Sequence, residues 1–104
     1  MKMAIFMLTC ANNAEADKIG KVLLEKKLIA CCKKMPVASS FWWKGIIEQT
    51  DETVLMMESV EEKFGEVNKE VKKLHSYDTF ILFSLPVGQT TKEVQEWLEK
   101  ELEE

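Results

Sequence analysis

Cys10 and His75 are the two side chains of this 104-residue sequence with the clearest capacity for chemistry. A thiol and an imidazole can act together as nucleophile and base, or they can be soft and borderline ligands for copper or zinc. No spacing rule links the two residues, and two ligands do not close a metal site. The structural alternatives are that Cys10 is a small buried hydrophobic residue and that His75, the only histidine, ends a helix.

The other sulfur-containing side chains are better explained by packing than by chemistry. Cys31 and Cys32 are adjacent within an apolar segment, form no CxxC motif and bring the number of cysteines to three. An odd number of thiols without a framework pattern is typical of a reducing cytoplasm. The sequence also lacks the motifs of phosphate-binding loops, dinucleotide-binding folds, serine hydrolases and zinc proteases. We therefore expect a protein that is not an enzyme.

Composition excludes two classes of partner. All 14 basic residues are lysines, and together with 18 carboxylates they leave a net charge of −4. An acidic chain without arginine lacks both the positive surface and the guanidinium contacts that nucleic-acid binding uses, and an anionic membrane is an equally poor partner. With 46% hydrophobic and 31% charged residues, we expect one globular domain over residues 1–104.

Three helices are predicted from their capping residues and apolar spacing. Asn12 opens the first helix as its N-cap, with Glu15 as capping-box partner. Ser59-x-x-Glu62 and Thr90-x-x-Glu93 are capping boxes that mark the starts of the second and third helices. The second helix must end near His75, because an apolar strand follows.

Short apolar runs between these helices predict strands. The polar segment 49–52 predicts a hairpin turn between two of them. Pro36 either bends a strand or divides it in two, since proline cannot donate to a sheet. The expected strands are residues 3–8, 28–32, 37–48, 53–57 and 80–85.

The order β-α-β-β-α-β plus a C-terminal helix indicates an α+β, ferredoxin-like sandwich with an antiparallel sheet and helices on one face. The uncovered face of such a sheet should be polar at alternate positions. Residues 3–8 and 80–83 are instead apolar throughout. The adjacent aromatic residues Phe41, Trp42 and Trp43 cannot all face one core either. We therefore expect another subunit to bury the second face, with these three residues at the interface.

Several segments resemble the CutA divalent-cation-tolerance proteins, in collinear order over nearly the whole chain. They are Leu28-Ile29-Ala30-Cys31, Ser40-Phe41-Trp42-Trp43-Lys44-Gly45, Leu74-His75-Ser76-Tyr77-Asp78, Leu85-Pro86-Val87 and Trp97-Leu98. The resemblance implies a ferredoxin-like subunit, a tight homotrimer similar to the PII signalling proteins and a cytoplasmic setting. It also implies copper binding and a role in metal tolerance, with Cys10 and His75 matching the cysteine and one histidine of the family's site.

The sequence departs from the family pattern at four positions. Leu74 stands where some members have a second histidine, which weakens the metal site, and Phe80 replaces a proline. Ile46 and Glu58 stand at positions that are commonly lysine, and the reversed charge of Glu58 can alter any nearby anion site. The alternative to metal binding is a PII-like signalling trimer with a small anionic metabolite in the clefts between subunits. An enzyme with a Cys–His pair is a third alternative, for which no further catalytic group is evident.

Overall fold

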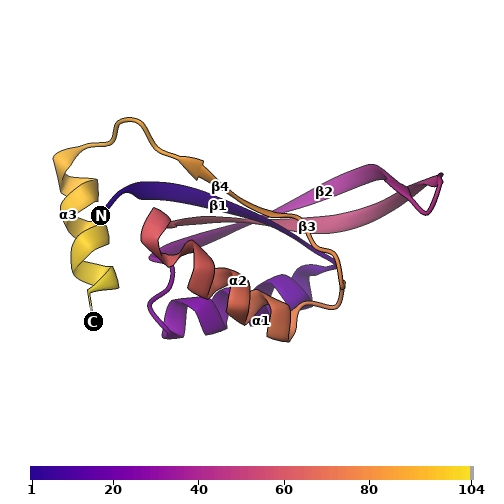
Figure 1. Cartoon of the computed structure of the whole chain (residues 1–104), viewed down its shortest axis with the longest axis horizontal. Coiled ribbons are helices and arrows are strands. Elements are labelled where there is room, and N and C mark those ends of the chain that lie inside the picture. The colour runs from indigo at the N-terminus through magenta and orange to yellow at the C-terminus, as the bar shows by residue number, and fades with distance from the viewer. Residues whose placement is uncertain (104) are drawn as a thin grey trace.

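Figure 1 shows the strands and helices of residues 1–103, the part of the chain that this computed structural model describes. They are, in chain order, β1 (Met3–Cys10), α1 (Asn13–Glu25), β2 (Cys31–Trp43), β3 (Ile46–Val60), a 3-10 turn (Glu61–Lys63), α2 (Phe64–Leu74), β4 (Leu82–Pro86) and α3 (Lys92–Leu102). This order confirms the predicted β-α-β-β-α-β succession with an additional C-terminal helix.

The strands form one antiparallel sheet in the order β2-β3-β1-β4. α1 and α2 lie on one face of this sheet, and α3 stands at the end where β1 begins (Figure 1). The predicted ferredoxin-like arrangement is therefore confirmed. Because β1 is a central strand, its last residue, Cys10, lies within the sheet, opposite Thr53 of β3.

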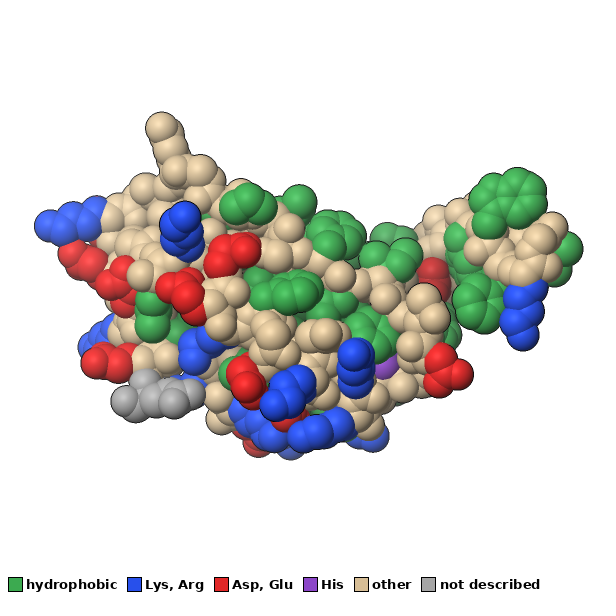
Figure 2. Space-filling model, viewed as in Figure 1, with side chains coloured by type: hydrophobic (Ala, Val, Ile, Leu, Met, Phe, Trp, Pro, Cys, Tyr) green, Lys and Arg blue, Asp and Glu red, His purple; other side chains and the backbone are tan. Residues whose placement is uncertain are grey.

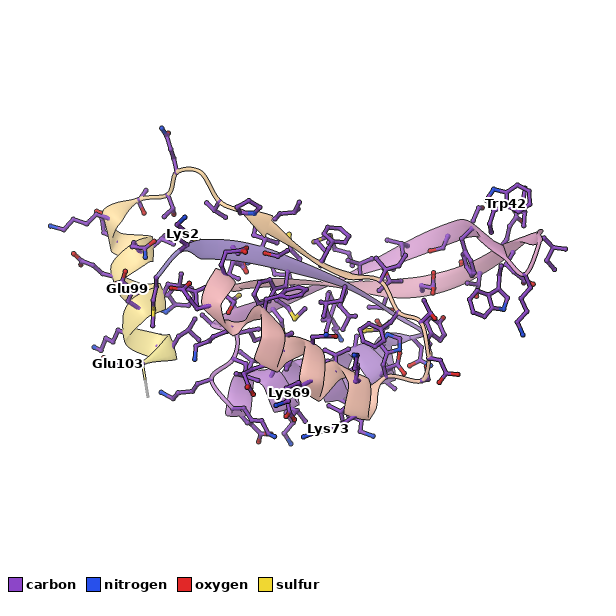
Figure 3. All side chains as sticks on the ribbon, viewed as in Figure 1. Lys2, Trp42, Lys69, Lys73, Glu99 and Glu103 are labelled. Carbon is purple, nitrogen blue, oxygen red and sulfur yellow. The ribbon has the colours of Figure 1, made fainter. Side chains whose placement is uncertain are left out.

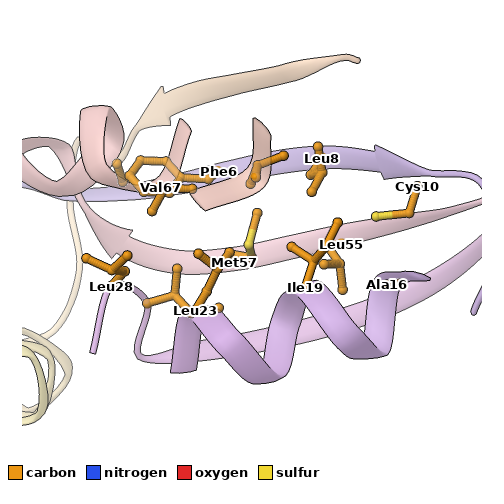
Figure 4. Close-up of a cluster of buried hydrophobic side chains, with 13 residues drawn as sticks. Phe6, Leu8, Cys10, Ala16, Ile19, Leu23, Leu28, Leu55, Met57 and Val67 are labelled. Atoms are coloured by element: carbon orange, nitrogen blue, oxygen red, sulfur yellow. The ribbon is translucent and has the colours of Figure 1, made fainter. Parts of the chain in front are cut away.

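The hydrophobic core lies between the sheet and the two helices (Figure 4). Alternate β1 residues from Ala4 to Cys10 are fully buried, because successive strand residues point to opposite faces. They pack with Leu55 of β3 and with the apolar stripes of α1 and α2. The ring of Phe6 meets that of Phe64 edge to face, with 5.3 Å between centroids. Each fully buried side chain of this size contributes about 1.5–3 kcal/mol, which holds both helices against the sheet.

The hairpin of β2 and β3 turns at Lys44-Gly45, so the predicted turn at residues 49–52 is wrong. Lys44 and Gly45 have φ angles of 51° and 83°, as a two-residue hairpin turn requires. Strand pairing continues from Trp43 opposite Ile46 to Cys31 opposite Glu58, and residues 49–52 therefore belong to β3. The error has a physical cause. Residues 37–52 of this hairpin lie beyond the part of β3 that pairs with β1, where polar strand residues are tolerated and resemble a turn.

The starts of β2 and β4 and the effect of Pro36 on β2 also differ from the prediction. The segment 28–30 precedes β2, and β4 starts at Leu82, two residues later than expected. Pro36 does not divide β2, which runs without interruption from Cys31 to Trp43. β2 is an edge strand, paired only with β3, so an edge position tolerates the missing N–H of proline.

The helix boundaries are partly as predicted. Asn12 caps α1 by accepting a hydrogen bond from the N–H of Glu15, and α2 ends directly before His75. Ser59 does not cap α2, because it lies in β3 and its hydroxyl donates to the carbonyl of Leu28. The N-cap of α3 is Thr91, one residue after the predicted one. None of the helices within residues 1–103 has the length and apolar character needed to cross a bilayer.

The sheet face opposite the helices carries apolar side chains on three neighbouring strands. This open face consists of Ile5 and Met7 of β1, Met56 of β3, and Phe83 and Leu85 of β4. Phe83 and Leu85 keep 43% and 49% of their surface exposed. Figure 2 shows hydrophobic side chains along β4 and again at the end of the hairpin. The predicted apolar second face is therefore present. α3 packs on one end of it, at Met3 and Val60, and leaves the open face uncovered.

Candidate metal centre

Three potential metal ligands meet where β1 ends. The Sγ atom of Cys10, a carboxylate oxygen of Glu15 and a ring nitrogen of His75 all lie within 4.8 Å of one another. Cys10 is the last residue of β1, Glu15 is in the first turn of α1, and His75 directly follows α2. The fold thus brings the two predicted ligands together and adds Glu15, which the sequence indicated only as a capping residue.

The side chain of His75 is fully buried, and both of its ring nitrogens have partners. Its Nε2 is 2.8 Å from the carbonyl oxygen of Thr9, to which it donates, and the N–H of Tyr77 donates to Nδ1 at 3.0 Å. These partners assign the tautomer with the proton on Nε2. Phe80 stacks on the imidazole with 5.0 Å between ring centroids and 19° between planes. Phe80 therefore holds the ring in place.

Glu15 connects the loop before α1 to the loop after α2. One carboxylate oxygen accepts the N–H of Ala11 at 2.9 Å and lies 3.5 Å from Nδ1 of His75. The other oxygen accepts the N–H of Ser76 at 2.8 Å. Burial acts to raise the pKa of this carboxyl, but hydrogen bonding from Ala11 and Ser76 outweighs it and holds the pKa below its ordinary value. Glu15 is therefore a carboxylate at neutral pH.

Cys10 is fully buried in the core beside this carboxylate. Burial raises the pKa of its thiol to about 12, and the charges of Glu15 and Glu52 add to the shift. A thiol with such a pKa carries its proton at neutral pH, so it is a poor nucleophile. The predicted alternative of a buried hydrophobic cysteine describes this environment well.

Glu52 and Tyr77 form a second link at the same end of the sheet. The hydroxyl of Tyr77 donates to Oε2 of Glu52 at 2.8 Å, and Glu52 keeps only 7% of its surface exposed. Burial and the neighbouring carboxylate raise the pKa of Tyr77 to about 12. The sequence did not indicate this pair, because residues 49–52 were expected to form a solvated turn. The bond fastens the loop after α2 to β3.

The cluster suits a soft or borderline metal ion, provided that the ion displaces the Tyr77 N–H from His75 and the proton from the Cys10 thiol. Copper and zinc bind thiolate, imidazole and carboxylate at about 2.0–2.3 Å, so donors this close together can reach one ion. An ion at Nδ1 of His75 would displace the N–H of Tyr77, and an ion at Cys10 would release the thiol proton. Magnesium and calcium prefer sets of oxygen ligands and do not suit these donors.

The other residues singled out from the sequence lie outside this cluster. Cys31 lies close to Lys33, with 3.6 Å between Sγ and Nζ, whereas Cys32 packs against the core. All three cysteines are free. Leu74, which was expected to stand in place of a further histidine, also packs against the core and offers no ligand. The predicted interface residues lie near the end of the hairpin: Phe41, Trp42 and Trp43.

Comparison with known proteins identifies close relatives. A family model described as CutA1 divalent ion tolerance protein matches residues 4–101. The divalent-cation tolerance protein CutA of Archaeoglobus fulgidus is 41% identical over 96 residues, which cover 92% of this chain and 94% of that protein. The protein of the same name from Thermotoga maritima is 40% identical over 96 residues, covering 92% of this chain and 95% of its own length.

The fold of this chain is also similar to those of solved structures. The structure of the periplasmic divalent cation tolerance protein CutA from Archaeoglobus fulgidus has a TM-score of 0.95 at 39% identity, and the match covers 97% of this chain and 99% of that one. CutA1 from Pyrococcus horikoshii has a TM-score of 0.92 at 27% identity, with the same coverage of 97% and 99%.

Proposed function

Because this chain belongs to the CutA1 divalent ion tolerance protein family, we propose that it is a non-enzymatic homotrimer that binds copper and acts in metal tolerance. The observation that carries the metal-binding part is the meeting of Cys10, Glu15 and His75 within 4.8 Å. The chain supplies one sulfur, one oxygen and one nitrogen ligand. Any further position on the ion would be filled by water or by another subunit.

Calorimetric titration with copper under reducing conditions tests this site. We expect wild type to bind weakly, because the ion must displace the N–H of Tyr77 and the proton of Cys10. Cys10→Ser and His75→Ala should each lower the affinity about tenfold or more, since loss of even an outer contact of a metal site costs about 10–100-fold. Cys31→Ser removes a thiol outside the cluster and should bind like wild type. Equal copper binding by all four proteins would contradict the site.

Two features support the homotrimer. The open face exposes a continuous apolar surface, which monomeric proteins rarely carry. The hairpin tip, residues 41–47, carries apolar side chains on both of its faces: the cross-strand pair Trp43–Ile46 on one and Trp42–Ile47 on the other. Trp42 lies at the far end of the hairpin, away from α1 and α2 (Figure 3). A hairpin with two apolar faces needs cover on both sides, which neighbouring copies in a closed ring can provide.

Light scattering coupled to size exclusion tests the assembly. The expected mass is three times the 12.0 kDa of the chain at micromolar concentration. A monomer mass at that concentration would contradict the homotrimer without affecting the metal titration, because the three ligands come from one chain.

The absence of enzymatic activity and a cytoplasmic location complete the proposal. The raised pKa and complete burial of Cys10 argue against a nucleophilic role, so iodoacetamide should label Cys10 no faster than free cysteine. Three free thiols suit a reducing compartment. Fractionation of cells that express the chain tests the location.

A further inference from the structure

Glu58 of β3 has a carboxylate oxygen that finds no partner within its own chain. Oε1 pairs with the ammonium group of Lys33 on the neighbouring strand β2. Oε2 is buried and accepts no hydrogen bond, and it is the only buried side-chain nitrogen or oxygen in this state among residues 1–103. Native proteins rarely leave such an atom unpaired, and each case calls for an explanation.

The strands around Glu58 show no hydrogen bond to this oxygen. Its cross-strand neighbours are Ile5 on β1 and Cys31 on β2, and Ile5 is followed by Leu85 on β4. Two of these side chains have no donor, and the thiol of Cys31 is a weak one. The ammonium of Lys33 is already committed to Oε1 and also lies 3.6 Å from the sulfur of Cys31. We therefore look for the missing donor outside these strands.

The unpaired oxygen belongs to the same side of the sheet as the open face. Glu58 lies opposite Ile5, an open-face residue, and strand alternation keeps paired residues on one side. Its side chain retains 14% of its surface exposed, so rotation about the last side-chain bond can turn Oε2 outward. Lys33, with 52% of its side chain exposed, reaches over the same surface. A molecule that covers the open face therefore also covers this ion pair.

We propose that a second copy of this chain donates a hydrogen bond to Oε2 of Glu58, and that this contact sets how one copy is oriented on the open face of the next. The inference rests on the homotrimer proposed above. An apolar surface alone accepts many relative orientations. A buried polar group accepts only those that satisfy it, so a single such group can select one arrangement.

The hairpin tip of a second copy has the required chemistry. It carries the indole N–H groups of Trp42 and Trp43 and the ammonium group of Lys44, all of which donate and cannot accept. Trp42 is 72% exposed and Trp43 is 46% exposed, so these rings are available to a neighbour. Their apolar bodies suit the open face, and their polar edges suit a carboxylate.

Exchanging the two charges tests the proposal. Lys33→Glu/Glu58→Lys keeps the ion pair between β2 and β3 but puts an ammonium group where the donor of the second copy needs an acceptor. We expect this variant to fold, as judged by circular dichroism, and to assemble about a hundredfold or more weakly by analytical ultracentrifugation. If the exchanged chain does not fold, Glu58→Gln, which keeps the shape but removes the charge, should weaken assembly about tenfold.

A matched pair on the other side of β2 provides the control. Lys34 forms an ion pair with Asp17 of α1, on the helix side of the sheet. Exchange of these two charges, Lys34→Asp/Asp17→Lys, should leave assembly unchanged. If the Lys33–Glu58 exchange or Glu58→Gln assembles as tightly as wild type, the inference is wrong although the homotrimer stands. A monomeric wild type would overturn both.

Discussion

Replacement of Met7 by lysine is expected to convert the assembled protein into folded monomers. Met7 lies at the centre of the open face, between Met56 of β3 and Phe83 of β4. In an isolated chain the lysine stays in water, so secondary structure should be retained. In the homotrimer its ammonium group would be removed from water and placed against the apolar surface of the next copy, which costs several kcal/mol and weakens association by about a hundredfold or more. Light scattering and circular dichroism measure the two quantities separately.

The control for this experiment is a lysine at an apolar position on the helix side of the sheet. Leu24 of α1 is 40% exposed and lines the groove between α1 and β2. Leu24→Lys should keep the trimer mass. If Met7→Lys also keeps it, the open face is not the surface through which the copies associate.

Glu15→Ala is expected to lower the free energy of unfolding by about 2–3 kcal/mol. The carboxylate accepts the N–H groups of Ala11 and Ser76, and its removal leaves both without this partner, Ala11 at a half-buried position and Ser76 at an exposed one. The loop after α2 then loses its connection to α1, and the position of His75 becomes less defined. Urea unfolding of both proteins at one chain concentration measures the difference, since assembly makes stability depend on concentration.

The effect of Glu15→Ala should depend on pH in a predictable direction. The pKa of Glu15 is lower in the folded chain than its ordinary value of 4.5. The carboxylate therefore contributes its stability above about pH 4.5 and loses it as the pH falls through the lower folded value. Wild type and variant should converge in acid.

Glu66 provides the control for the charge itself. It occupies the first turn of α2, as Glu15 does in α1, but it is exposed. Glu66→Ala should cost less than about 1 kcal/mol, the usual value of a carboxylate at a helix N-terminus. An equal loss in both variants would show that Glu15 acts only through the helix dipole.

The candidate site was only partly accessible from the sequence. Cys10 and His75 were identified by residue type and by family resemblance, and the fold brings them together. Glu15 was recognised as a cap of α1, but its bond to Ser76 joins residues 61 positions apart. The bond between Glu52 and Tyr77 was missed, because the polar segment 49–52, which contains Glu52, resembles a turn. Capping follows from local spacing, whereas these long-range bonds depend on how the loops cross the end of the sheet.

What the sequence by itself determined is the order of elements, the ferredoxin-like fold and the excess of apolar surface. These features follow from burial. Apolar residues recur about every second position in a half-buried strand and about every 3.6 positions in a helix, so their spacing is visible in the sequence. The apolar residues on both sides of β1 already implied cover beyond the helices.

Only the tertiary structure decided the turn at Lys44-Gly45, the ligand cluster and the unpaired oxygen of Glu58. The turn depends on two backbone conformations with positive φ, which a Lys-Gly pair permits but does not require. Whether Cys10 has a proton, and whether Glu58 has a donor, depend on the dielectric surroundings and on atoms from distant segments. These properties depend on contacts between groups that are distant in the sequence. The spacing of apolar and polar residues along the chain does not predict them.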